Sequence, residues 1–66
     1  MQVEVEEEAD GRWIGEVSGL SGVMAYGASR EEAIRKAEAL ALRVLADRLE
    51  HDEQTPELMN VFAVPA

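Results

Sequence analysis

Alternating polar and apolar side chains open the chain and predict β structure. Over residues 2–6, Val3 and Val5 alternate with polar residues, which is the two-residue period of a strand with one face in the core. The pair Asp10-Gly11 follows, and it predicts a hairpin with a type I′ turn because both residue types tolerate a positive φ. We therefore expect a second, antiparallel strand over residues 12–17.

Glycines leave space on the second predicted strand and form the turn that follows it. Gly15 shares a strand face with Trp13 and Val17, and its missing side chain leaves room for the indole or for a helix lying across the sheet. The segment 18–22 contains two glycines and predicts a turn. The short apolar run over residues 23–26 then predicts a third strand.

A long helix is predicted from about Arg30 to Glu50. Ser29 and Glu32 form a capping-box sequence, in which the serine hydroxyl accepts from the N–H of Glu32 and the Glu32 carboxylate accepts from the N–H of Ser29. The run that follows is rich in helix-forming residues and contains neither glycine nor proline. Seven apolar positions share one side of this helix and are expected to pack on the sheet: Ala33, Ile34, Ala37, Leu40, Ala41, Val44 and Leu45.

The end of the chain predicts one more strand. Pro56 ends the polar segment after the helix, and residues 58–64 are apolar in both alternating phases. After a crossover helix, such a strand can pair in parallel with the first strand. The expected fold is α+β with the order β-β-β-α-β, a three-stranded antiparallel meander plus a fourth strand in parallel, in one domain over residues 1–66.

Surplus apolar positions predict self-association. One sheet face has no predicted helix, although Ile14 and Tyr26 fall on it, and the helix carries more apolar residues than one sheet face needs. We therefore expect a homodimer or a higher homo-oligomer. The residues expected at its interface are Met24, Leu42, Leu49, Met59 and Val61.

Charge and composition narrow the classes of function. The 66 residues include 14 acidic and 6 basic side chains, for a formal net charge of -8. Such a charge repels phosphate backbones and favours a basic partner. The absence of cysteine excludes disulfides and thiolate chemistry, and the chain has no long apolar stretch for a membrane span and no secretory signal pattern. We expect a cytoplasmic protein.

Catalytic chemistry finds no support in the sequence. Glu4, Glu6 and Glu8 follow one another at two-residue spacing, which is typical of a solvated strand face rather than of carboxylates that converge on a metal. His51 is the only histidine and falls at the end of the predicted helix, where a positive charge suits the helix dipole. The glycines do not form a phosphate-binding loop. We expect no enzyme activity, no cofactor and no metal site.

Three segments of the chain resemble the HicB-like antitoxin family. They are Asp10–Val17 (DGRWIGEV), Gly19–Gly22 (GLSG) and Gly27–Ala33 (GASREEA). The family pattern is roughly Asp-Gly-aromatic, then a Pro-x-Leu-Pro-Gly loop, then Gly-x-Ser/Thr-x-Glu-Glu-Ala before the helix. Gly19 and Ser21 stand where the family has its two prolines. The resemblance covers nearly the whole chain.

The resemblance implies both a fold and a partner. HicB-like proteins have a truncated ribonuclease-H-like core that neutralises HicA, a small basic mRNA-cleaving toxin of the double-stranded-RNA-binding fold, by occluding it. On this basis Glu4, Glu6 and Glu8 are the expected steering residues, with Trp13 or Tyr26 as anchors. Autoregulating members carry a C-terminal DNA-binding segment that we do not find in this sequence, so we expect no direct nucleic-acid binding by this chain alone.

Two other functions remain open from the sequence. The chain can be an orphan module that has kept the fold and self-associates without a toxin, or a protein that binds a small molecule or nucleotide. A neighbouring gene for a small basic protein would favour the antitoxin function over the orphan module. A ligand found in a pocket would favour the third.

Overall fold

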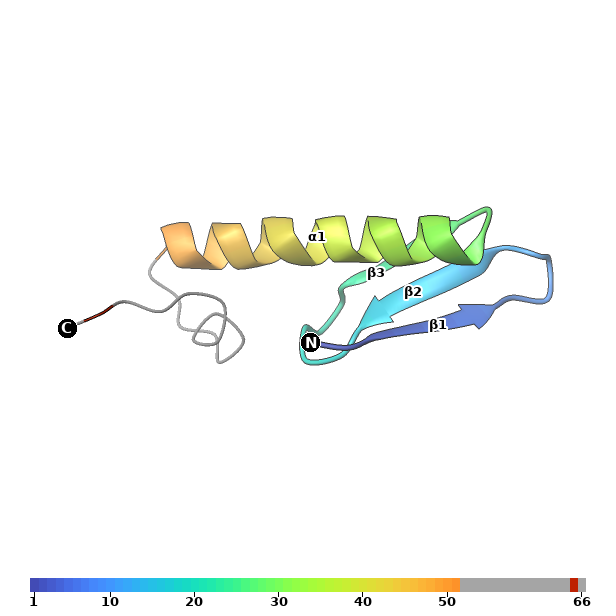
Figure 1. Cartoon of the computed structure of the whole chain (residues 1–66), viewed down its shortest axis with the longest axis horizontal. Helices are drawn as coiled ribbons and strands as arrows, with labels where there is room; N and C mark the ends of the chain where they lie inside the picture. Colours follow the sequence, from blue (N-terminus) through green and yellow to red (C-terminus); the bar gives the residue numbers. More distant parts are fainter. Residues whose placement is uncertain (52–64, 66) are drawn as a thin grey trace.

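A three-stranded sheet and one helix make up the described fold. The computed structural model describes residues 1–51 and 65, with β1 at Val3–Glu7, β2 at Trp13–Val17, β3 at Met24–Gly27 and α1 at Arg30–Glu50. The strands are antiparallel in the order β1-β2-β3, and α1 lies along one side of the sheet (Figure 1). The predicted α+β class, meander and helix are confirmed. The fourth strand predicted over residues 58–64 lies outside the described residues.

The first hairpin is confirmed, but its predicted turn type is wrong. β1 and β2 pair from Val3 opposite Val17 to Glu7 opposite Trp13. Beyond that pair, the N–H of Glu8 donates to the carbonyl of Arg12 at 2.7 Å, and the N–H of Gly11 donates to the carbonyl of Glu8 at 3.0 Å. The loop therefore has three residues, with glycine in the left-handed region at φ 90°, in place of the two-residue type I′ turn.

Two glycines let α1 lie close against the sheet. A Cβ on Gly15 would stand 2.8 Å from the carbonyl oxygen of Ala33, and a Cβ on Gly27 would stand 2.5 Å from the nitrogen of the same residue. Both distances are shorter than a carbon atom tolerates, so any side chain at either position would push the helix away. Of the two uses expected for the space at Gly15, the structure shows the helix and not the indole.

The core forms where α1 meets the sheet and the loop between β2 and β3. Its residues are Val17, Leu20, Val23, Ala37, Ala41 and Leu45, and Ala33 is also buried. At 21 residues α1 is about 31 Å long, whereas a strand of 5 residues spans only about 17 Å, so the helix runs past the end of the sheet (Figure 1). Leu20, at 2% exposed, fills the space under this part of the helix. No helix of the described residues is long and apolar enough to cross a membrane.

The capping residues fix the start of α1. The backbone of Ser29 is extended, and its hydroxyl accepts from the N–H of Glu32 at 3.1 Å, as predicted. The carboxylate of Glu32 accepts at 3.0 Å from the N–H of Ala28, however, and not from Ser29. Lys36 lies one turn further on, with its Nζ 3.3 Å from the same carboxylate. The bond from Ala28, helped by Lys36, holds the pKa of Glu32 below its ordinary value.

Candidate binding face of the sheet

The side of the sheet opposite α1 is the candidate site, and we call it the outer face. Side chains alternate along each strand, and α1 packs over the glycine and valine positions of β2, Gly15 and Val17. The outer face therefore consists of the residues in the other phase: Glu4, Glu6, Ile14, Glu16, Met24 and Tyr26. No described element covers it, and Met24 and Tyr26 are 43% and 44% exposed.

Strand register divides the outer face into an acidic half and an apolar half. Two rows of three side chains cross the sheet: Glu4, Glu16 and Met24 in one, and Glu6, Ile14 and Tyr26 in the next. The carboxylates lie toward β1, and the apolar side chains lie toward β3. The two halves meet at an open cavity of about 300 Å³, where three glutamates and Val5 surround Ile14.

The carboxylates of the outer face lack cationic partners among the described residues. Glu4 lies directly opposite Glu16 in the register, and like charges at that position destabilise a sheet. None of the three glutamates forms an ion pair with another described side chain. The face therefore holds uncompensated negative charge that a positively charged ligand would neutralise.

Arg12, next to β2, is already paired at the turn. Arg12 donates from Nε to the Asp10 carboxylate at 2.8 Å, and its guanidinium lies 4.5 Å from the centroid of the Tyr26 ring. The backbone N–H of Arg12 also donates to Asp10 at 3.1 Å. These hydrogen bonds, led by the one from the backbone, lower the pKa of Asp10. Arg12 thus stacks over the aromatic ring and pairs with Asp10, and it forms no ion pair with the carboxylates of the acidic half.

Three of the five predicted partner-binding residues lie together on this face. Glu4 and Glu6 are exposed on β1, and Tyr26 is exposed on β3. Glu8 does not join them, because β1 ends at Glu7 and Glu8 is half-buried in the turn. Trp13 shares the phase of Gly15, so its half-buried side chain belongs to the side of the sheet that α1 covers.

Two residues of the face are missing from the predicted site. Glu16 completes the set of three carboxylates, and Ile14 forms the floor between them. The signal for both was the alternation along β2. Once Gly15 and Val17 are assigned to the core, the residues between and before them must point the other way.

The predicted oligomer interface does not form one surface. Met24 lies on the outer face, whereas Leu42 and Leu49 lie on α1, on the other side of the sheet, and are 65% and 55% exposed. Met59 and Val61 lie outside the described residues. The structure thus separates the exposed apolar side chains of the sheet from those of the helix.

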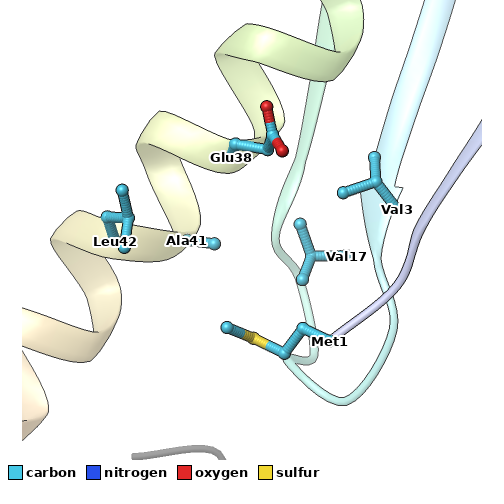
Figure 2. A pocket seen from close by; sticks show the side chains of 6 residues that line it. All are labelled: Met1, Val3, Val17, Glu38, Ala41 and Leu42. Atoms are coloured by element: carbon cyan, nitrogen blue, oxygen red, sulfur yellow. The ribbon is translucent and has the colours of Figure 1, made fainter. Parts of the chain in front are cut away.

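A second open cavity lies between α1 and the edge of β1. It measures about 250 Å³ and brings Met1 and Val3 opposite Ala41 and Leu42 of the helix (Figure 2). Glu38 supplies its single carboxylate (Figure 2). The lining is therefore mainly apolar, in contrast to the outer face.

The chemistry of the outer face favours binding of a cationic surface. Three carboxylates around an apolar floor attract a lysine or arginine, whose methylene stem then packs on Ile14. Among residues 1–51 and 65, no three histidine, cysteine, aspartate or glutamate side chains lie in an arrangement that holds a metal ion. Comparison of the chain with protein-family models, with curated proteins and with solved structures gave no match in any of the three.

Proposed function

We propose that this chain is an antitoxin-like binding module of the HicB-like type, which neutralises a small basic mRNA-cleaving toxin by occlusion. The observation that carries the proposal is the outer face, where three carboxylates surround a half-buried apolar floor. The resemblance of residues 10–33 to HicB-like antitoxins names the class of partner. The module acts as a binding protein and not as an enzyme, in the cytoplasm where mRNA is cleaved.

Charge supports the first step of binding. The net charge of -8 attracts a cationic protein from a distance, and Glu4, Glu6 and Glu16 concentrate that charge on one face. Complementary charge mainly raises the rate of association, and salt reduces it. A basic toxin is therefore captured on the outer face, and nucleic acid is repelled by it.

The apolar half of the outer face supports the second step of binding, in which the attracted partner is held in place. Ile14 lies at the junction of the two halves, and Tyr26 and Met24 extend the apolar surface along β3. A tyrosine with Arg12 stacked over its ring is an anchor of the kind found at the centres of protein interfaces. Burial of these side chains slows dissociation, so the complex can block the toxin without any covalent step.

A fourth strand completes the fold that this proposal implies. We propose that residues 58–64 pair in parallel with β1 and extend the sheet to a partial ribonuclease-H-like sheet. One observation supports it: no described strand pairs with the other edge of β1. An apolar strand would cover that edge.

The second candidate function is an orphan module that self-associates without a toxin. The exposed leucines of α1, Leu42 and Leu49, favour it, because large apolar side chains on a surface mark contact sites. Self-association and toxin binding use different sides of the molecule and are compatible. The orphan function therefore differs from the first only in the absence of a cationic partner.

Co-expression with the small basic protein encoded beside this chain tests the proposal. We expect the two to co-purify and the chain to rescue growth from that protein. A variant with Glu4, Glu6 and Glu16 all changed to Lys should lose rescue and bind with a much slower association rate, measured by stopped-flow fluorescence. Because exposed charges contribute little to stability, its circular dichroism should match that of the natural chain.

A matched control variant distinguishes the effect of the outer face on binding from the effect of net charge. Changing Glu7, Glu8 and Glu38 to Lys produces the same net charge but alters residues off the outer face. We expect that variant to keep most of the binding. Equal losses in both variants would show that only net charge matters, and absence of any complex would leave the orphan module as the function.

A further inference from the structure

The second half of α1 carries an exposed ridge with coiled-coil spacing. Ala39, Leu42, Ala46 and Leu49 follow one another at intervals of three, four and three residues, and this set is the helix ridge. Residues at such intervals share one side of a helix and fit the repeat by which two helices pack together. Leu42 and Leu49 are the two most exposed large apolar side chains of the helix.

The helix ridge lies on the flank of α1, next to the side that packs on the sheet. The buried positions of α1 are Ala33, Ala37, Ala41 and Leu45, which repeat every four residues along that packed side. Leu42 and Ala46 follow directly after two of these positions, so their side chains are turned about 100° from the sheet. Leu42 also borders the open cavity beside β1, but most of its side chain is exposed, and so is that of Leu49.

We propose that two copies of this chain pair through the helix ridge, with their α1 helices antiparallel. Alanine at alternate ridge positions lets helix backbones approach to the short end of the usual 8–10 Å, and the two copies of Leu42 then lie next to each other near the two-fold axis. In the register that sets Ala39 opposite Ala46 of the second copy, Arg35 lies opposite Glu50. The two-fold symmetry makes each of these contacts twice.

Charge selects a second copy as the occupant of the helix ridge. Both signs flank it, with Arg35 and Arg43 among the cations and Glu38 and Glu50 among the anions, and all four are exposed. A strongly cationic partner would meet the two arginines, whereas an identical helix in the antiparallel register meets its opposite charge at each end. The helix ridge is therefore self-complementary, in contrast to the outer face, whose three carboxylates would repel a second copy.

Sedimentation of the full chain tests the pairing. We expect the mass of two chains at high micromolar concentration, and the mass of one chain for Leu42→Glu at the same concentration. Met24→Glu is the matched control, since it places the same charge on the exposed apolar surface of the outer face. It should leave the dimer intact. Dissociation by Met24→Glu alone would move the interface to the outer face and overturn the proposal.

A charge exchange tests the register. Arg35→Glu should weaken the dimer at least several-fold in dissociation constant, and adding Glu50→Arg to the same chain should restore it. If the double variant dissociates as much as the single one, the two residues do not face each other. A monomeric natural chain at high micromolar concentration overturns the pairing itself.

Cross-linking gives the direction of the helices. The chain has no cysteine, so single-cysteine variants report only their own position. In an oxidised mixture of Ala39→Cys and Ala46→Cys, the antiparallel register produces the mixed disulfide, while a parallel pair produces only disulfides between identical variants. If Leu42→Glu lowers the unfolding temperature without any change of mass, the occupant is another part of the same chain, and the proposal fails.

Discussion

Single atoms decide how closely α1 approaches the sheet. Gly15 and Gly27 bring the backbone of Ala33 to within 2.8 Å and 2.5 Å of the place where a Cβ would stand. A backbone atom cannot rotate away as a flexible side chain does, so the helix itself would have to move.

Gly15→Ala should therefore destabilise the fold by about 1–3 kcal/mol, because the added methyl group overpacks the contact with Ala33. The measurement is the urea midpoint of the helical circular dichroism signal. Ser21→Ala, at an exposed position of the loop between β2 and β3, should leave the midpoint almost unchanged. An unchanged midpoint for Gly15→Ala would mean that α1 does not lie this close.

The cap of α1 predicts a dependence of stability on pH. Hydrogen bonding to Ala28 and the charge of Lys36 hold the pKa of Glu32 below its ordinary value of 4.5 in the folded chain. A lowered pKa means that the ionised carboxylate stabilises the fold above the unfolded pKa, and that this contribution is lost as the pH falls through the folded pKa.

Glu32→Gln should accordingly lower stability at pH 7, and its deficit relative to the natural chain should shrink as the pH falls below about 4.5. Urea titrations at several pH values measure both curves. Ser29→Ala, which removes the other half of the cap, should cost about 1 kcal/mol at every pH. A Glu32→Gln deficit that stays constant with pH would contradict the role of the charge.

At the scale of elements, α1 has two sides with different tasks. Leu45 is 3% exposed in the core cluster, whereas Leu42, three positions earlier, is 65% exposed on the helix ridge. The same residue type therefore contributes to folding at one position and remains available for contact at the other. Leu20 and Val23, from the loop between β2 and β3, belong to the same core cluster as Leu45.

Truncating the two leucines separates these tasks. Leu45→Ala should destabilise the chain by about 2–5 kcal/mol, or unfold it, at any protein concentration, because it leaves a cavity in the core. Leu42→Ala should change stability by less than about 0.5 kcal/mol in dilute solution and by more at high concentration, where helix pairing contributes. Thermal unfolding at two protein concentrations measures both. A large effect of Leu42→Ala in dilute solution would place this side chain in the monomer's core.

For the whole molecule, acidic charge opposes folding and assists binding. Glu4 and Glu16 repel each other across the outer face, within a chain of net charge -8. No described cation lies paired with either glutamate, so their repulsion lowers the stability of the fold. A neutral residue at one of the two positions would restore that stability. Binding surfaces commonly lie at positions where stability is reduced in this way.

Glu16→Gln should therefore raise the stability of the isolated chain by about 0.2–1 kcal/mol, because it removes the repulsion, and should slow its association with a cationic partner. Added sodium chloride should reduce both differences by screening. Urea unfolding and stopped-flow association at low and high salt measure the two effects. A variant that gains stability without losing association rate would exclude Glu16 from the binding face.

Local signals in the sequence determined the elements of this fold. The alternation in β1, the apolar period of α1 and the cap at Ser29 each depend on residues no more than four positions apart, and they predict β1, β2 and α1 to within one residue. The apolar run at residues 23–26 likewise predicts β3 to within one residue.

Tertiary structure alone decided which side chains meet. Glu8 and Glu16 are equally acidic in the sequence, but the end of β1 and the three-residue turn remove the first from the outer face, while pairing with Glu4 brings the second onto it. A strand residue changes face with every single-residue shift of register, so a small uncertainty in a turn becomes a complete uncertainty in the site. The closeness of α1 to β2 likewise followed from the contact between Ala33 and Gly15, which are 18 residues apart in the chain.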